Sequence, residues 1–337
     1  MAEQYEKKEL RQHIYDTPDT YVGGIDVINE VLPIKDGDKI VFKEIEYIPA
    51  LLNIFNEILV NARDQIVRLQ GSKGANIIQV SHIKIDFNDD DGSISVLNDG
   101  NGIVVKEHEK EKIYIPQLIF GELLTSSNYK KDEKRIVGGK NGYGAKLANI
   151  FSQTFTIETV DHINGLKYTQ VWEKNMTVCN KPVIKKCPGK PYTKITWKCD
   201  FGRFGIQKYS DDMINLMYRR IYDIAGITDK SINVFLNGEK IKIKSFLEYI
   251  NLYNDSVKYQ EIVSDRWDVI FSVSHNDTFE QVSFVNGICT SKGGSHVECI
   301  AKQVCNGIIA FIKKQHKKEI KDKVVRRYIS LYINCVI

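Results

Sequence analysis

Glu57, Asn61 and Asp64 lie in a segment whose apolar residues recur with helical spacing. The segment is 49–70, PALLNIFNEILVNARDQIVRLQ, and its leading proline and its periodicity predict a helix. At 100° per residue the three polar positions fall on one stripe, away from the apolar stripe. Such a stripe is ordinarily the solvated face of a helix. Here it combines a carboxylate suited to general-base work with a neutral oxygen ligand suited to Mg²⁺.

A second candidate is NDGNG, residues 98–102, at the end of a strand pair predicted over 83–102. Asn98 ends the second strand. Gly100 and Gly102 would let the backbone pass close to a flat ligand. The alternative is a plain hairpin turn, because N-D-G occurs in many hairpins.

The third candidate is VGGKNGYGAKLANIFS, residues 137–152, which is dense in glycine before a predicted helix. It is not a Walker A loop, because no Lys-Ser/Thr pair follows the glycines, and no parallel βαβ unit surrounds it. Bare amides at 142–145 that open a helix would favour an anion, and Lys146 would add a positive charge. Ser126, Ser127 and Asn128 precede this loop and offer hydroxyl and amide groups. A structural glycine hinge is the alternative.

Composition limits the class of protein. The net charge is +4, with 47 Lys and Arg against 43 Asp and Glu, so composition alone does not indicate a nucleic-acid-binding protein. The seven cysteines are scattered and form no C-x-x-C pair, which disfavours a zinc site and a disulfide framework. No apolar run approaches a membrane span, and the polar N-terminus does not resemble a secretory signal. We therefore expect a soluble intracellular protein that has no contact with membranes.

The order of predicted elements favours an α+β fold in two domains. Strands are predicted at FTIETVD, LKYTQVWEK and YTKITWKC, and a hairpin at INVFLNGEKIKI. Residues 118–129 are predicted to be a helix that runs out into a polar segment, and a further helix is predicted near 210–225. A new series of predicted elements begins near 255–260. Two more strands, RWDVIFSVS and EQVSFVNGICT, then precede a helix through VECIAKQVCNGIIAFIKKQ. The predicted domains are 1–258 and 259–337.

Together the three candidates are far more specific than any one of them. Glu…Asn on a helix, then N-x-G-x-G, then a glycine lid is the order of the ATP-binding fold shared by gyrase, heat-shock chaperones, histidine kinases and mismatch-repair proteins. The chain most closely resembles the ATPase region of eukaryotic-type type IIA DNA topoisomerases. YEKKELRQHI…PDTYVGG resembles that family's N-terminal strap, and NEILVNARDQ its base-bearing helix. LIFGELLTSSNY, GGKNGYGAKLANIFS and SFVNGICTSKGGSHVE resemble its phosphate-contacting segment, signature loop and transducer domain.

The resemblance implies a Bergerat-type α/β sandwich, with a mixed sheet backed by helices, followed by a smaller α+β transducer domain. It implies that Glu57 polarises the attacking water, that Asn61 ligates Mg²⁺ and that Asn98 reads the adenine amino group of ATP. The implied contacts to ribose and phosphates are Ser126, Ser127, Asn128, Gly139, Lys140, Asn141, Gly142, Tyr143, Gly144, Ala145 and Lys146. Tyr5, in the strap, is implied to reach the nucleotide of a partner subunit.

Two parts of the family pattern are missing from this sequence. No Gln-Thr-Lys triplet is present, and no tyrosine can be nominated as the DNA-cleaving nucleophile. The DNA-cleavage region of such an enzyme is therefore expected to lie outside this chain. We expect an N-terminal fragment, or else a separate subunit, that binds ATP and hydrolyses it slowly at best.

The basic tract KKQHKKEIKDKVVRR, residues 313–327, is the last candidate. Its ordinary interpretation is a solvated helix end. By resemblance it occupies the place of the transducer's lysine-rich loop, so Lys313, Lys314, Lys317 and Lys318 are expected to contact the backbone of double-stranded DNA without sequence specificity.

The resemblance implies an ATP-operated clamp. ATP binding would close a homodimer around a DNA duplex, and hydrolysis would reopen it. Three alternatives stay open: a chaperone-type clamp, which would need a client-binding domain; a histidine-kinase type, for which no phosphoacceptor helix is found; and a separate ATP-sensing subunit. The expected location is the nucleus for a cellular enzyme, and a viral factory or the host cell for a viral one.

Overall fold

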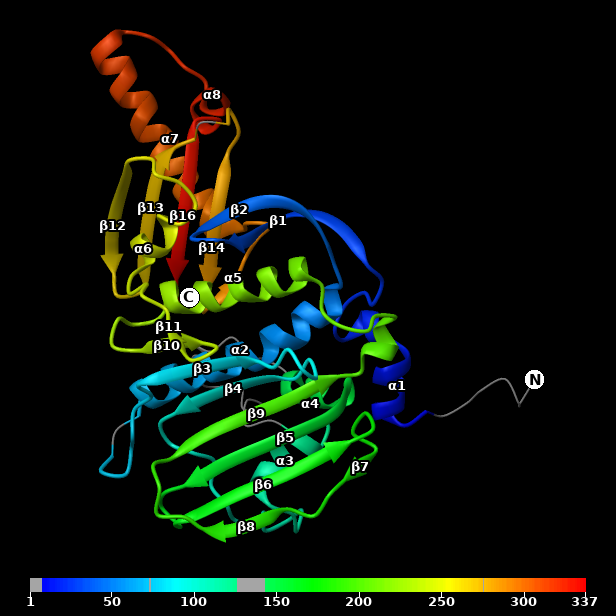
Figure 1. The fold of residues 1–337 in the computed structure, drawn as a ribbon. Helices are drawn as coiled ribbons and strands as arrows, with labels where there is room; N and C mark the ends of the chain where they lie inside the picture. Colours follow the sequence, from blue (N-terminus) through cyan, green and yellow to red (C-terminus); the bar gives the residue numbers. More distant parts are fainter. Residues whose placement is uncertain (1–7, 73, 126–142, 275) are drawn as a thin grey trace, which may run out of the picture. The chain divides into compact units, whose positions relative to one another are not determined.

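The structure is a computed structural model that describes residues 8–72, 74–125, 143–274 and 276–337. The chain divides into two compact units. The first contains the residues through Ala225 together with Lys230–Lys242, and the second contains Gly226–Asp229 and Ile243–Ile337. Each unit combines helices with a sheet, so the predicted α+β class is confirmed (Figure 1).

A mixed sheet forms the centre of the first unit. Its nine described strands are β3 (His82–Phe87), β4 (Ile94–Asp99), β5 (Ser152–Asp161), β6 (Leu166–Glu173), β7 (Val178–Cys179), β8 (Val183–Lys186), β9 (Tyr192–Cys199), β10 (Asn233–Leu236) and β11 (Glu239–Lys240). The strand order is β11-β10-β3-β4-β9-β5-β6-β7, and β8 also pairs with β6. The β10–β3 pair is parallel, whereas the β3–β4, β4–β9, β9–β5 and β5–β6 pairs are antiparallel. This order disagrees with a doubly wound parallel sheet and agrees with a sandwich.

Helices cover one face of this sheet. The helices of the first unit are α1 (Leu10–Asp16), α2 (Pro49–Gln70), α3 (Ile115–Gly121), α4 (Gly144–Ile150) and most of α5 (Asp211–Ile227), with short 3₁₀ turns at Pro18–Thr20 and Phe201–Phe204. Phe55 of α2 packs on Phe87 and Trp197 of the sheet, with ring centroids 5.9 and 6.4 Å apart. A separate hairpin, β1 (Ile28–Asp36) with β2 (Lys39–Tyr47), precedes α2. Figure 1 shows α2, α3 and α4 behind the sheet.

The second unit has its own five-stranded sheet and core. Its elements are α6 (Phe246–Ile250), β12 (Lys258–Ser264), β13 (Trp267–Val273), β14 (Glu280–Val285), β15 (Ile288–Cys289), α7 (Ser295–His316), α8 (Asp322–Arg326) and β16 (Ile329–Cys335). The order is β12-β13-β16-β14-β15. Buried residues of α7, Val297, Ala301 and Cys305, pack in one core with Leu331 and Ile333 of β16. The long amphipathic helix therefore closes one face of the sheet.

The predicted domain boundary after residue 258 falls inside the second unit. Residues 243–258 belong there because α6 packs into that unit: Phe246 and Tyr249 lie with their ring centroids 6.2 and 6.0 Å from that of Phe284. Gly226, near the end of α5, touches Tyr249, and a side chain at this glycine would overlap it. The change in sequence pattern at β12 marks the start of a sheet, whereas the unit already begins with the packing of α6.

Several local predictions agree with the structure and one does not. The helix predicted from 49–70 spans those residues, and Asn237-Gly238 turns the β10–β11 hairpin with φ of 48° and 80°. The helix predicted to run out into a polar segment within 118–129 ends at Gly121, and Glu122 is extended. The single strand predicted at EQVSFVNGICT is wrong: it is two strands, β14 and β15, joined by a turn in which Asn286 and Gly287 have φ of 51° and 81°. No helix among the described residues is long and apolar enough to cross a membrane.

Candidate active site

The helix α2 carries Glu57, Asn61 and Asp64, but the three side chains differ in exposure. Glu57 is exposed to solvent, Asn61 is half-buried, and Asp64 is fully buried beside Arg63, with Oδ1 3.6 Å from Nη1. The stripe is therefore not a uniform solvated face. It runs from solvent into the protein along two turns of one helix.

Gly144, the first residue of α4, lies directly against the Glu57 side chain. A Cβ built on Gly144 would overlap Oε2 of Glu57 and stand 2.8 Å from its Cδ. Only glycine lets α4 begin this close to α2. The structure thus brings together two features that lie 87 positions apart, the candidate base and the glycine-rich segment.

The surroundings of Glu57 change its acidity. Burial of the carboxyl among protein atoms raises the pKa of Glu57, and the negative charge of Asp64 raises it further. Although solvent reaches the side chain, much of the space around the carboxyl is filled by α4 and by its own helix. A raised pKa makes the carboxylate a stronger base than an ordinary surface glutamate.

Asn61 lies one helical turn after Glu57, on the same side of α2. Within the described residues the side-chain amide of Asn61 makes no hydrogen bond, so its Oδ1 is available as a ligand. The same residues contain no group of three His, Cys, Asp or Glu side chains that could hold a metal ion. The donor chemistry of Asn61 fits Mg²⁺, which typically takes few protein oxygens and completes its shell with phosphate and water oxygens.

Asn98 faces the helix layer near the carboxyl end of β4. Ile94, on the same strand, is opposite both Phe87 and Trp197, the two rings that touch α2. Side chains alternate along a strand, so Asn98, four residues later, lies on the face that α2 covers. It is buried, and Nδ2 donates to the carbonyl of Asp99 over 2.9 Å.

Two threonines beside Asn98 were not among the predicted site residues. Thr193 is directly opposite Asn98, and Thr159 is opposite Thr193 on the next strand. Their hydroxyl oxygens are 3.0 Å apart, and Thr159 Oγ1 also accepts from the amide of Ile103 over 2.9 Å. The sequence places both threonines in strands that are predicted to pair. Their alignment with Asn98 depends on the strand register, which no local sequence pattern fixes.

Gly100 and Gly102 serve packing within the protein. Gly100 has a φ of +88°, and a Cβ there would press on Val80 and Leu69 at 2.9 and 3.0 Å. A Cβ on Gly102 would overlap the carbonyl of Val160. The loop after β4 therefore packs closely against the sheet and α2 at both glycines, and the expectation that they let the backbone approach a flat ligand stays a prediction.

The buried side of α4 holds the chain after α3 through two polar side chains. Lys146 Nζ donates to both the carbonyl and Oγ1 of Thr125 at 2.7 Å, and Asn149 Nδ2 donates to the carbonyl of Phe120 over 3.1 Å. Burial lowers the pKa of Lys146 to about 8, although the charge of Glu122 opposes this shift. Lys146 thus positions the residue that immediately precedes Ser126.

The remaining predicted residues fall in three groups. Tyr5, Ser126, Ser127, Asn128, Gly139, Lys140, Asn141 and Gly142 lie outside the described residues. Tyr143 is the N-cap of α4, with helical φ and ψ, and Ala145 is buried. In the second unit, Lys313, Lys314, Lys317 and Lys318 are exposed where α7 ends, and Lys313 pairs with Glu319 over 2.8 Å.

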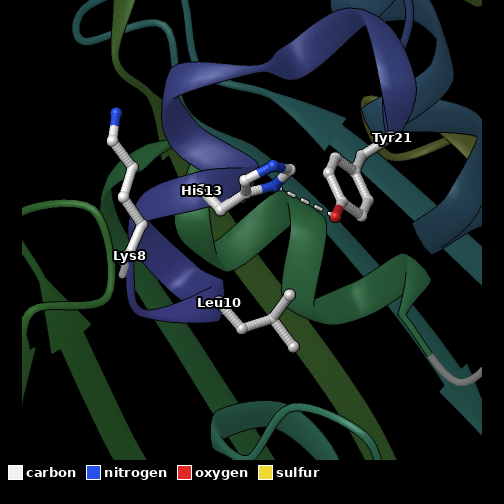
Figure 2. Close-up of a pocket in the computed structure, with 4 residues that line it drawn as sticks. All are labelled: Lys8, Leu10, His13 and Tyr21. Atoms are coloured by element: carbon white, nitrogen blue, oxygen red, sulfur yellow. Dashed lines mark hydrogen bonds between the residues drawn. The ribbon is translucent and has the colours of Figure 1, made fainter. Parts of the chain in front are cut away.

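The part of the strap that the structure describes is packed on its own chain. Figure 2 shows a surface hollow lined by Lys8, Leu10, His13 and Tyr21, in which the Tyr21 hydroxyl lies 3.2 Å from His13 Nδ1. The ring of Tyr15 stacks on Phe151, just after α4, with centroids 5.9 Å apart. None of these side chains belongs to the predicted nucleotide site.

Comparison with known proteins identifies the family. The chain matches the crystal structure of the ATPase region of *Saccharomyces cerevisiae* topoisomerase II with a TM-score of 0.90 and 41% identity, over 100% of this chain and 87% of that one. The chain belongs to the topoisomerase II family. The predicted resemblance and the predicted sandwich fold are thereby confirmed.

Other topoisomerase II relatives agree. The structure of the ATPase and transducer domains from *Balamuthia mandrillaris* matches with a TM-score of 0.92 and 40% identity, over 99% of this chain and 85% of that one. The DNA topoisomerase 2 of *Candida glabrata* is 43% identical over 100% of this chain and 25% of its own length. The DNA gyrase B family model matches residues 235–337. The chain spans about a quarter of the length of the curated relatives it matches.

Gly144→Ala tests the contact between α4 and α2. The added methyl must displace either the Glu57 carboxylate or the start of α4, so we expect a loss of about 1–3 kcal/mol in the free energy of unfolding. Chemical denaturation measures this loss. The matched control is Gly307→Ala in α7, where a Cβ meets nothing within 4 Å and the helix should gain up to about 1 kcal/mol. Equal effects of the two substitutions would contradict the close contact.

Proposed function

We propose that this chain is the ATP-operated gate of a type IIA DNA topoisomerase. ATP binding would pair two copies around a DNA duplex, and hydrolysis with product release would separate them. The observation that carries the proposal is the Glu57 carboxylate held against Gly144 at the start of α4, with Asn61 one turn further along α2. Membership of the topoisomerase II family supports it, as does the gyrase B match over the second unit.

The first unit would bind ATP and the second would act as the transducer. Asn98 would offer its amide to the adenine and Thr193 its hydroxyl, while Thr159, which is fully buried and donates to the carbonyl of Tyr192, would hold Thr193 in place. The bare Cα of Gly144 and the neighbouring Tyr143, Ala145 and Lys146 would lie along the phosphates. Ser126, Ser127, Asn128 and the residues 139–142 are proposed phosphate and ribose contacts on the sequence alone.

Glu57 would take a proton from the water that attacks the γ-phosphate. Phosphoryl transfer depends mostly on positioning and charge stabilisation, and a positioned base adds about 10²–10⁴-fold. Asn61 would hold Mg²⁺, which when bound neutralises charge on the phosphate oxygens. Tyr5 is proposed to reach the partner copy's nucleotide, and Lys313, Lys314, Lys317 and Lys318 to contact DNA phosphates. The enzyme would work in the nucleus, or in a viral factory if viral.

The mass of the protein in solution tests the gate directly. With Mg²⁺ and a non-hydrolysable ATP analogue, light scattering should show a shift from one chain to two. Asn61→Ala should abolish the shift, because removing the amide oxygen takes away the proposed metal ligand. The matched control is Arg68→Ala, an exposed residue of the same helix, which should dimerise normally. A wild-type mass that stays at one chain while calorimetry records analogue binding would contradict closure by this chain.

The pH dependence of single-turnover ATP hydrolysis tests the role of Glu57. A base must be deprotonated, so the rate should fall as pH drops through the pKa of Glu57, which burial and Asp64 hold above its usual value of 4.5. Asp64→Asn removes a negative charge, which lowers the pKa of Glu57. The fall in rate on the acid side of the profile, the acid limb, should therefore move to lower pH. Glu57→Gln should cost about 10²–10⁴-fold in rate and leave no such limb. If Asp64→Asn, folded as judged by circular dichroism, leaves the limb in place, a group other than Glu57 controls it.

Proton uptake tests whether Lys146 senses the phosphates. Its pKa of about 8 means that a large fraction is neutral near pH 8.5, and a nearby triphosphate would recharge it. Analogue binding at pH 8.5 should therefore take up part of a proton, measured by calorimetry in two buffers of different ionisation enthalpy. The uptake should vanish near pH 6.5, where Lys146 is already charged, and in Lys146→Met. The exposed control Lys106→Met should keep it, and uptake that persists in Lys146→Met would refute the assignment.

A further inference from the structure

A second run of lysines lies in the first unit, far along the sequence from the tract at 313–327. Between Glu173 and Asp200 the chain has no acidic residue, although Asp and Glu make up 43 of its 337 residues. The same stretch contains Lys174, Lys181, Lys185, Lys186, Lys190, Lys194 and Lys198, and no arginine. Elsewhere in the chain positively and negatively charged residues are interspersed, as in KEHEKEK at 106–112.

The stretch forms one edge of the nine-stranded sheet and then returns to its interior. β7 and β8 both pair with β6, and the chain then crosses back to β9, two strands further in (Figure 1). Lys185 and Lys186 lie in β8, with Lys181 just before it and Lys190 just after it, and all four are exposed.

Lys194 and Lys198 of β9 lie on the sheet face opposite the helices. They alternate with Ile195 and Trp197, and Trp197 contacts Phe55 of α2, so the lysines face the other way. Lys194 is opposite Glu158, whose carboxylate already accepts from Lys167 over 2.7 Å and from Tyr192. The one acidic group beside Lys194 is thus largely neutralised by others.

Within the described residues none of the seven lysines forms an ion pair. Lysines in an edge strand often protect it from pairing with another sheet, and this accounts for Lys185 and Lys186. It does not account for Lys181 and Lys190, which are exposed but lie outside β8. Lys194 and Lys198 are half-buried in the interior strand β9, where Glu158 is opposite Lys194 and Asp91 interacts electrostatically with Lys198, so the uncompensated charge is concentrated at the edge. An edge with only positive charges has an electrostatic cost unless an anion covers it.

We propose that Lys181, Lys185, Lys186, Lys190, Lys194 and Lys198, here called the edge-lysine surface, bind the sugar-phosphate backbone of duplex DNA. This rests on the proposed function, which brings a duplex to this chain. Protein interfaces are enriched in aromatic residues and arginine and depleted in lysine, whereas lysines acting as point charges suit phosphates. The contact would be independent of base sequence and would weaken with salt.

The test is the salt dependence of binding to a fluorescent 40-base-pair duplex, measured by anisotropy with the full chain. The variant Lys185→Gln/Lys186→Gln/Lys190→Gln removes three charges from the edge-lysine surface. The matched control Lys106→Gln/Lys110→Gln/Lys112→Gln removes three charges from the segment of alternating sign. Each phosphate contact contributes about 0.9 to the slope of log K against log salt, so we expect the slope to fall by about 2–3 in the variant and to stay unchanged in the control.

Three results would overturn the inference: wild-type protein that does not bind the duplex at low salt, equal slopes in variant and wild type, or equal losses in variant and control. If the variant loses binding to polyglutamate but keeps its binding to DNA, the surface serves an acidic protein. If the only change in the variant is more aggregation, the lysines protect the sheet edge. The analogue-driven mass shift is measured on the same variant. A normal shift together with an unchanged DNA slope rejects the edge-lysine surface and leaves the ATP gate standing, whereas loss of the shift in wild type rejects the gate itself.

Discussion

The missing side chain of Gly144 is the constraint on which the candidate active site depends. Because no Cβ stands between them, α4 begins against the Glu57 carboxylate on α2. Burial of the carboxyl raises the pKa of Glu57, with Asp64 adding to the shift, and α4 is one of the elements that lie against it. This one backbone position thus fixes how closely the two helices approach at the proposed base.

The same short helix determines where the chain enters the segment that begins at Ser126. Lys146 and Asn149 are both buried, and both donate to residues between Phe120 and Thr125. Burying these groups is costly unless they are hydrogen-bonded, and among the described residues Oδ1 of Asn149 has no partner. A helix that served only packing would place apolar residues at these positions. The polar groups fit a helix that holds the chain after α3 in a fixed relation to α4.

The sequence predicted the parts of this arrangement that depend on local patterns. The helical period of α2 and the alternating strands β5, β6 and β9 were readable because each buries one face against a core. The order Glu…Asn, N-x-G-x-G and glycine loop led to the family.

The sequence could not predict contacts between segments that are far apart in the chain. That Gly144 touches Glu57, that Thr193 stands opposite Asn98 and that Gly102 packs on Val160 all follow from register and close approach between segments far apart in the chain. The start of the second unit at α6 has no local signal for the same reason, because α6 joins that unit through Phe284.

The charge of the chain is best understood by where the lysines lie. A net charge of +4 conceals lysines of two kinds: Lys146, buried and with a depressed pKa, and the lysines of the edge-lysine surface, which are exposed or half-buried and form no ion pair within the described residues. These two kinds of lysine suit two kinds of anion. A buried amine interacts through a medium that salt screens little, so it suits a small ligand held in a closed site. Exposed lysines gain affinity by releasing the counterions of a polyanion, so their contribution falls as salt rises. A gate that must bind ATP tightly at cellular ionic strength and yet release a duplex in each cycle needs both kinds of lysine. The structure keeps the two kinds on separate parts of the first unit. Lys146 lies inside α4, and the edge-lysine surface lies on the edge and the helix-free face of the sheet.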